Sequence, residues 1–191
     1  MKRGFIVFLV AVSMCCITGC GTEKTKVPVS ETNDSAAKSL KDSSNQEYYM
    51  VTFASGIEYW KDCFNGFKQA ASLHGSKTVY AGTNDLDVTK AVAVLEQVIA
   101  KNPAGIAVTC LNPDAYVDPI NEAVEKGIPV VTFDSDSSRS NRYTYLGTGN
   151  ANAGAKAASY MATLLNHQGK VAIITMPGNL TQEERCSGFK S

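Results

Sequence analysis

The chain has 191 residues, with 18 basic and 18 acidic side chains and a formal net charge of +0 at neutral pH. This balance excludes the basic field by which proteins attract nucleic acid, and no helix-turn-helix segment is present, so no nucleic-acid partner is expected. Hydrophobic residues make up 44% of the chain, enough for one substantial folded domain.

The first twenty residues have the layout of a secretory signal. Lys2 and Arg3 give a positive start, and a short apolar run covers residues 5–17. The run is shorter than the roughly 20 apolar residues of a membrane-spanning helix. It ends in the sequence ITGC, which resembles the lipobox, where a peptidase cuts before a lipid-bearing cysteine. We therefore expect residues 1–19 to be a lipoprotein signal peptide, and the lipidated Cys20 to anchor the protein to the outer side of the cell membrane, in the periplasm or on the cell envelope.

A polar segment follows the predicted lipidation site. Residues 21–47 are rich in Ser, Thr, Lys, Asp and Asn, and they contain no aromatic residue and no sustained apolar period. Such a composition cannot bury enough apolar surface to offset the entropy lost on ordering. The sequence therefore predicts a flexible, lipid-anchored tether over residues 20–47.

From residue 48 onward, short apolar runs alternate with helix-length segments. The runs are rich in β-branched or aromatic residues and mostly lack strict alternation, which is typical of buried parallel strands. They are YYMVTFA, TVYAG, GIAVTC, IPVVTF, YTYLG and KVAIIT. The segments between most of them are amphipathic, as in the stripe of Val88, Val92, Leu95 and Ile99. This alternation predicts an α/β fold, with a parallel sheet flanked by helices on both faces.

Residues directly after the predicted strands are the candidates for binding, because open α/β sheets bind ligands at the carboxyl ends of their strands. Tyr59 and Trp60 follow the first strand, and Asp134 and Asp136 follow the fourth. Aromatic faces pack on the C–H faces of sugar rings, and carboxylates accept hydrogen bonds from hydroxyl groups. Asn112 adds amide donors and acceptors. The alternatives are structural, since such aromatics often belong to the core and such aspartates often cap helices or form turns.

Signatures of catalysis are weak. The sequence GTGNANAG follows a strand and opens a helix, but the dinucleotide pattern fails at Asn152. We expect instead that Asn150 caps the helix and that Gly154 allows close packing. There is no nucleophile elbow and no Walker A loop, so the sequence predicts a protein that is not an enzyme and holds no cofactor.

The histidines and cysteines do not form a metal-binding pattern. His74 and His167 both fall near the ends of predicted helices, where the helix dipole favours a partly positive imidazole. Cys63, Cys110 and Cys186 are odd in number and far apart. A disulfide framework and a structural zinc site are therefore not expected. We expect the three cysteines to be small, buried or half-buried residues.

Four segments carry a resemblance to a known family. These are the aromatic pair at residues 59–60, the stretch NPAGIAVTCLNPDAYVDPINEAVEKGIPVVTFDSD, the segment YLGTGNANAGAKAASYM, and EERCSGF. In this order and spacing, residues 48–191 resemble the periplasmic sugar-binding proteins of the ribose-binding type, the solute receptors of ABC importers. The resemblance implies a type I periplasmic-binding-protein-like fold, in which Tyr59 and Trp60 stack on a sugar, Asp134 accepts its hydroxyl groups, and Arg185 reaches it from the second lobe.

The sequence also departs from the family pattern. Ser135 stands where ribose binders often carry Arg, and Ile57 stands where an Asn is common, so ribose itself is not the expected ligand. Against two-lobed relatives, residues 48–148 correspond to the N-terminal lobe and residues 149–191 to an incomplete start of the second lobe. We therefore expect a truncated receptor.

The resemblance implies delivery of a monosaccharide or similar small polyol to the permease and ATPase subunits of an ABC transporter. The alternative is a receptor subunit that presents its ligand to a chemoreceptor or a sensor kinase. The sequence does not separate the two.

Overall fold

The computed structural model describes residues 45–191. The predicted signal peptide, Cys20 and nearly all of the predicted tether lie outside the described residues. Within the described part of the chain, no helix has the length and apolarity needed to cross a membrane.

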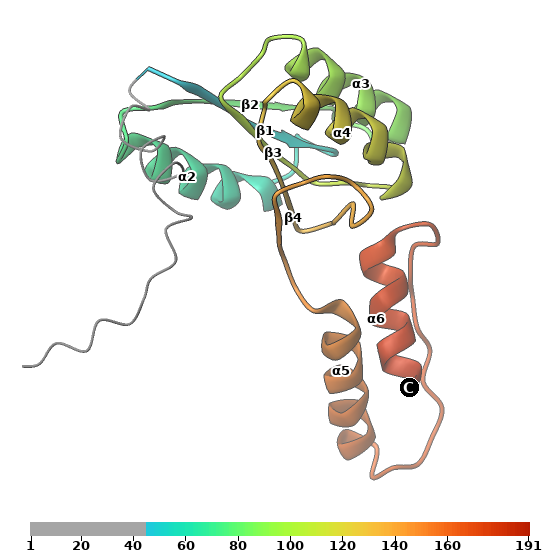
Figure 1. Ribbon diagram of the computed structural model, residues 1–191. Helices are drawn as coiled ribbons and strands as arrows, with labels where there is room; N and C mark the ends of the chain where they lie inside the picture. Colours follow the sequence, from blue (N-terminus) through green and yellow to red (C-terminus); the bar gives the residue numbers. More distant parts are fainter. Residues whose placement is uncertain (1–44) are drawn as a thin grey trace, which may run out of the picture. The chain divides into compact units, whose positions relative to one another are not determined.

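The core of the fold is a parallel five-stranded sheet in the order β2-β1-β3-β4-β5. The strands are β1 (Glu47–Thr52), β2 (Lys77–Gly82), β3 (Gly105–Val108), β4 (Val130–Phe133) and β5 (Thr144–Leu146). In Figure 1, helix α2 (Tyr59–Ser72) covers one face of this sheet, while α3 (Val88–Ile99) and α4 (Val117–Glu125) cover the other. The predicted α/β fold with helices on both faces is confirmed.

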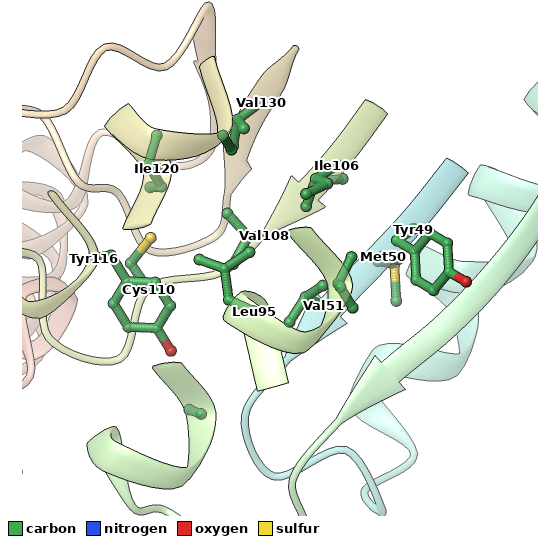
Figure 2. Close-up of a cluster of buried hydrophobic side chains, with 14 of the residues drawn as sticks. Tyr49, Met50, Val51, Leu95, Ile106, Val108, Cys110, Tyr116, Ile120 and Val130 are labelled. Atoms are coloured by element: carbon green, nitrogen blue, oxygen red, sulfur yellow. The ribbon is translucent and has the colours of Figure 1, made fainter. Parts of the chain in front are cut away.

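The apolar runs become central strands because both of their faces are covered. All four residues of β3 are buried, and Val108 at its end is 0% exposed. Figure 2 shows Val108 beside Leu95 of α3, with Tyr116, Ile120 and Val130 nearby. Burial of each such side chain stabilises the fold by about 1.5–3 kcal/mol, which explains why these runs lack polar alternation.

Two further helices pack against each other. They are α5 (Asn150–Leu164) and α6 (Leu180–Lys190), which lie side by side in Figure 1. A Cβ atom added to Gly154 would lie 2.1 Å from the carbonyl oxygen of Arg185, and one added to Gly188 would lie 1.9 Å from that of Ala151. The helices therefore touch backbone to backbone, and the prediction that Gly154 permits close packing is confirmed.

The predicted sixth strand, KVAIIT, is not formed. Residues 170–176 have no regular secondary structure, and Ile174 is 98% exposed. A strand needs a neighbour to satisfy its backbone hydrogen bonds, and no described strand pairs with this segment. The segment has the composition of a strand, but the described part of the chain offers it no strand to pair with.

Candidate functional site

Asp134 lies at the carboxyl end of β4, at the sheet edge where the sequence predicts a ligand. Its backbone has a φ of +59°, in the left-handed region that Asp tolerates better than most residues. Two contacts with β5 hold this conformation. The Asp134 amide donates to the carbonyl of Leu146 at 3.0 Å, and the Tyr145 hydroxyl donates to the Asp134 carbonyl at 2.8 Å. Tyr145 was not predicted as a site residue, because one Tyr in a strand carries no sequence signal of this role.

The structure brings Tyr59 and Asp134 together, although they are 75 residues apart in the chain. The Tyr59 hydroxyl donates to Oδ1 of Asp134 at 2.8 Å, and the Ser135 hydroxyl donates to Oδ2 at 3.3 Å. The hydrogen bond to Asp134 raises the pKa of Tyr59. Tyr59 is still 62% exposed. An accessible aromatic ring thus lies beside a carboxylate, the pair of groups by which a sugar is recognised.

Trp60 does not share this exposed position. Its side chain is 2% exposed, and its indole N–H donates to the carbonyl of Phe53 at 2.9 Å. The ring packs edge-on against Tyr59, Phe53 and Phe133, with centroid distances of 4.7, 5.6 and 5.8 Å. The ring is thus a buried support beneath Tyr59, and its stacking on a ligand stays a prediction.

Asp136 is committed to an internal ion pair. Arg142 donates through Nε to Oδ1 and through a terminal nitrogen to Oδ2 at 2.7 Å, while Thr132 donates to Oδ1 at 2.6 Å. Burial alone would raise the pKa of Asp136, but the hydrogen bonds from Arg142 and Thr132 outweigh it and the pKa is lowered. Since its side chain is only 12% exposed, Asp136 stabilises the loop after β4. Its contact with a ligand stays a prediction.

Asn112 precedes Pro113, the N-cap residue of the short 3-10 helix Asp114–Tyr116, and its side chain caps the first amides of that helix. Its Oδ1 accepts from the backbone amides of Asp114 at 3.1 Å and Ala115 at 3.2 Å. It also lines a cavity of about 370 Å³ that includes neither Tyr59 nor Asp134. The capping role occupies its oxygen, so any contact with a ligand falls to its amide nitrogen.

Arg185 lies in the middle of α6 and is tied to the start of α5. Its Nε donates to Oδ1 of Asn150 at 2.9 Å, and Nδ2 of Asn150 donates to Glu184 at 3.1 Å. The prediction that Asn150 caps α5 is wrong: Gly149 occupies the cap position, and Asn150 is the first helical residue. Its side chain faces α6 and not its own helix.

Comparison with known proteins agrees with this geometry. Residues 48–191 match the model of the periplasmic binding protein domain. The D-allose-binding periplasmic protein of Escherichia coli is 30% identical over 152 residues, which cover 74% of this chain and 49% of that protein.

Two solved structures are more similar in sequence, and each alignment covers 76% of this chain and 50% of the other. A sugar-binding protein of a sugar ABC transporter from Bacillus halodurans is 48% identical, with a TM-score of 0.72. AraP, an arabinose-binding protein from Geobacillus stearothermophilus, is 51% identical, with a TM-score of 0.68.

The chain spans about half the length of the relatives it matches. The family is one of binding proteins, in agreement with the prediction that the chain is not an enzyme. The match over residues 48–191, together with the parallel sheet and the polar residues at its carboxyl edge, establishes that the chain belongs to the periplasmic binding protein family.

Proposed function

We propose that this protein is an extracytoplasmic receptor that binds a monosaccharide and delivers it to an ABC permease. The observation that carries the proposal is the contact of the exposed Tyr59 with the Asp134 carboxylate at the carboxyl edge of the sheet. The relatives' names support a sugar as the solute. One is an allose-binding protein, one is an arabinose-binding protein, and one is the sugar-binding protein of a sugar ABC transporter.

The roles of the individual residues follow from their surroundings. Tyr59 offers an exposed ring to the apolar face of the sugar, and Asp134 offers carboxylate oxygens to its hydroxyl groups. Arg185 and the amide of Asn112 are the further donors in this proposal. We also propose the domain division at residues 148 and 149, with the sheet body as the N-terminal lobe and the helix pair opening the second.

The sugar site is tested by titrating the 191-residue chain with D-allose, L-arabinose and D-ribose, and by following amide signals by NMR. We expect saturable shifts at Tyr59 and Asp134 for at least one sugar. Asp134→Asn keeps the shape and the tolerance for a positive φ but removes the charge, so the affinity should fall at least about tenfold.

Asp118→Asn is the matched control, because Asp118 is an exposed carboxylate on α4. Its affinity should equal that of the wild type. Absence of saturable shifts with every sugar, or an Asp134→Asn variant that binds as the wild type does, would contradict the proposal.

Membrane anchoring is a separate part of the proposal and rests on the ITGC motif alone. Cys20→Ser removes the thiol that carries the lipid. After growth of a bacterial host with a labelled fatty acid, we expect the wild-type protein to carry the label and to be shortened by signal cleavage, and the variant to be unlabelled and to keep its signal peptide. The signalling alternative stays a prediction, and loss of sugar uptake on deletion of the receptor gene would favour transport over it.

A further inference from the structure

We infer that Asn150 is the residue that positions Arg185 for its ligand. Asn150 is the first residue of α5 and is 4% exposed. A buried amide must satisfy its own hydrogen bonds, and this one does so entirely through α6. It accepts from Arg185 Nε at 2.9 Å and donates to Glu184 at 3.1 Å.

The chemistry of the partners fixes the direction of both hydrogen bonds. A guanidinium can only donate, and an ionised carboxylate can only accept. The Asn150 amide therefore has to turn its oxygen to Arg185 and its nitrogen to Glu184. Only one of its two orientations satisfies both neighbours, so Glu184 locks the amide that holds Arg185.

The backbone of Arg185 is fixed from the same helix face. Asn150 and Gly154 are four residues apart and lie on one side of α5. The Arg185 carbonyl lies so close to Gly154 that a Cβ there would be 2.1 Å from it. Helix α5 therefore packs closely against the Arg185 carbonyl and accepts a hydrogen bond from its Nε.

This arrangement leaves the two terminal guanidinium nitrogens of Arg185 available for a ligand. Arg185 is exposed, and within residues 45–191 its two terminal nitrogens have no hydrogen-bond partner. An arginine anchored through Nε loses less conformational freedom on binding than a free one, because its planar fork is already oriented. Asn150 thus contributes to affinity without touching the ligand.

The test has two readouts, because a ligand role for Arg185 rests on the proposed function. The first is the NMR signal of the Arg185 Nε–H in the ligand-free chain, where a hydrogen bond to a buried amide slows exchange with water. The second is the affinity for whichever of D-allose, L-arabinose and D-ribose the wild type binds. Asn152→Ala is the matched control, since Asn152 is exposed in the same turn of α5.

In Asn150→Ala we expect loss of Nε–H protection and a roughly tenfold lower affinity, as for loss of a hydrogen bond to a charged group. Asn150→Asp should also lose Nε–H protection and sugar affinity, because its carboxylate would face the carboxylate of Glu184. Combining it with Glu184→Gln supplies an amide that donates to the new Asp, and this double variant should regain protection and wild-type affinity within about threefold. A purely structural role would not produce this rescue.

Protection of the Nε–H in Asn150→Ala, or no rescue in a folded double variant, would overturn the inference. The inference would also be overturned if Arg185→Ala abolished sugar binding while Asn150→Ala left the sugar affinity unchanged. If the wild type binds no sugar, the proposed function fails, and the NMR readout still decides whether Asn150 holds Arg185.

Discussion

The hydroxyl of Tyr145 donates a 2.8 Å hydrogen bond to the backbone carbonyl of Asp134, from the neighbouring strand. Support of this kind fixes the peptide group that follows the carboxylate-bearing residue, and with it the direction of the side chain. The site is therefore held by β5 as well as by the loop that carries Asp134.

Removal of this hydroxyl should weaken both the fold and the site. Tyr145→Phe deletes one hydrogen bond to a half-buried carbonyl, so we expect the free energy of unfolding to fall by about 0.5–1.5 kcal/mol in urea titrations. Sugar affinity should fall with it. Tyr143→Phe is the control, because Tyr143 is 71% exposed and no described residue bonds its hydroxyl. Equal effects of the two substitutions would contradict the role given to Tyr145.

The Asp136–Arg142 pair should make stability depend on pH. Arg142→Met leaves a largely buried carboxylate without its partner, and we expect a loss of about 2–4 kcal/mol at neutral pH. Arg139→Met is the control: its pair with Asp114 is exposed, with side-chain exposures of 68% and 71%, so its loss should stay under about 1 kcal/mol.

The sign of the pH dependence follows from the lowered pKa of Asp136. The stabilisation is fully present above the unfolded-state pKa of about 4, and it is lost as pH falls through the lower folded-state pKa. Urea unfolding at several pH values should therefore show the wild type approaching Arg142→Met in acid. A gap between the two that stays constant as the pH falls would contradict this account.

The helix pair should be sensitive to a single methyl group. Gly188→Ala would place a Cβ 1.9 Å from the Ala151 carbonyl oxygen, so we expect the helices to separate and stability to fall by about 1–3 kcal/mol. Gly66→Ala in α2 is the opposite case, because no atom beyond the neighbouring backbone of its own helix lies within 4 Å of its Cβ position. That variant should gain about 0.5–1 kcal/mol. Hydrogen exchange of the α5 and α6 amides distinguishes local loosening from global unfolding.

Thr109 offers a route to higher stability. Its side chain is 0% exposed, and its hydroxyl oxygen has no hydrogen-bond partner in the described part of the chain. Thr109→Val keeps the shape and removes the unsatisfied group, so the free energy of unfolding should rise by about 1 kcal/mol. Thr52→Val is the matched contrast, because the Thr52 hydroxyl bonds the Tyr80 hydroxyl at 2.9 Å and its loss should destabilise. A stabilised Thr52→Val would undermine this reasoning.

Much of the fold could be predicted from sequence because hydrophobic pattern and burial agree in the central strands β1, β3 and β4. The runs that became β1 to β5 are apolar and β-branched, and the order of strands and helices leaves few topologies. KVAIIT has the same composition and is not a strand, because a strand also needs an adjacent strand to pair with its backbone, and the composition of a segment does not show whether one is present.

The site was predicted less completely, for a related reason. Asp134 and Tyr59 follow their strands in the sequence, so their meeting at the sheet edge could be expected. Position after the strand does not distinguish Asp134 from Asp136, and only the family resemblance singles out Asp134. The structure gives Asp134 an exposed aromatic neighbour and Asp136 a half-buried arginine. Partners such as Arg142, Tyr145 and Asn150 become visible only when the chain is folded.

At Asp134, the residue that best suits the positive φ is not the residue that the ligand requires. A non-glycine residue in the left-handed region costs about 1–2 kcal/mol, and glycine would remove that cost. Glycine would also remove the carboxylate. Selection for a sturdier fold and selection for ligand recognition therefore call for different residues here, and Asp134→Gly would improve the backbone conformation while abolishing its proposed use.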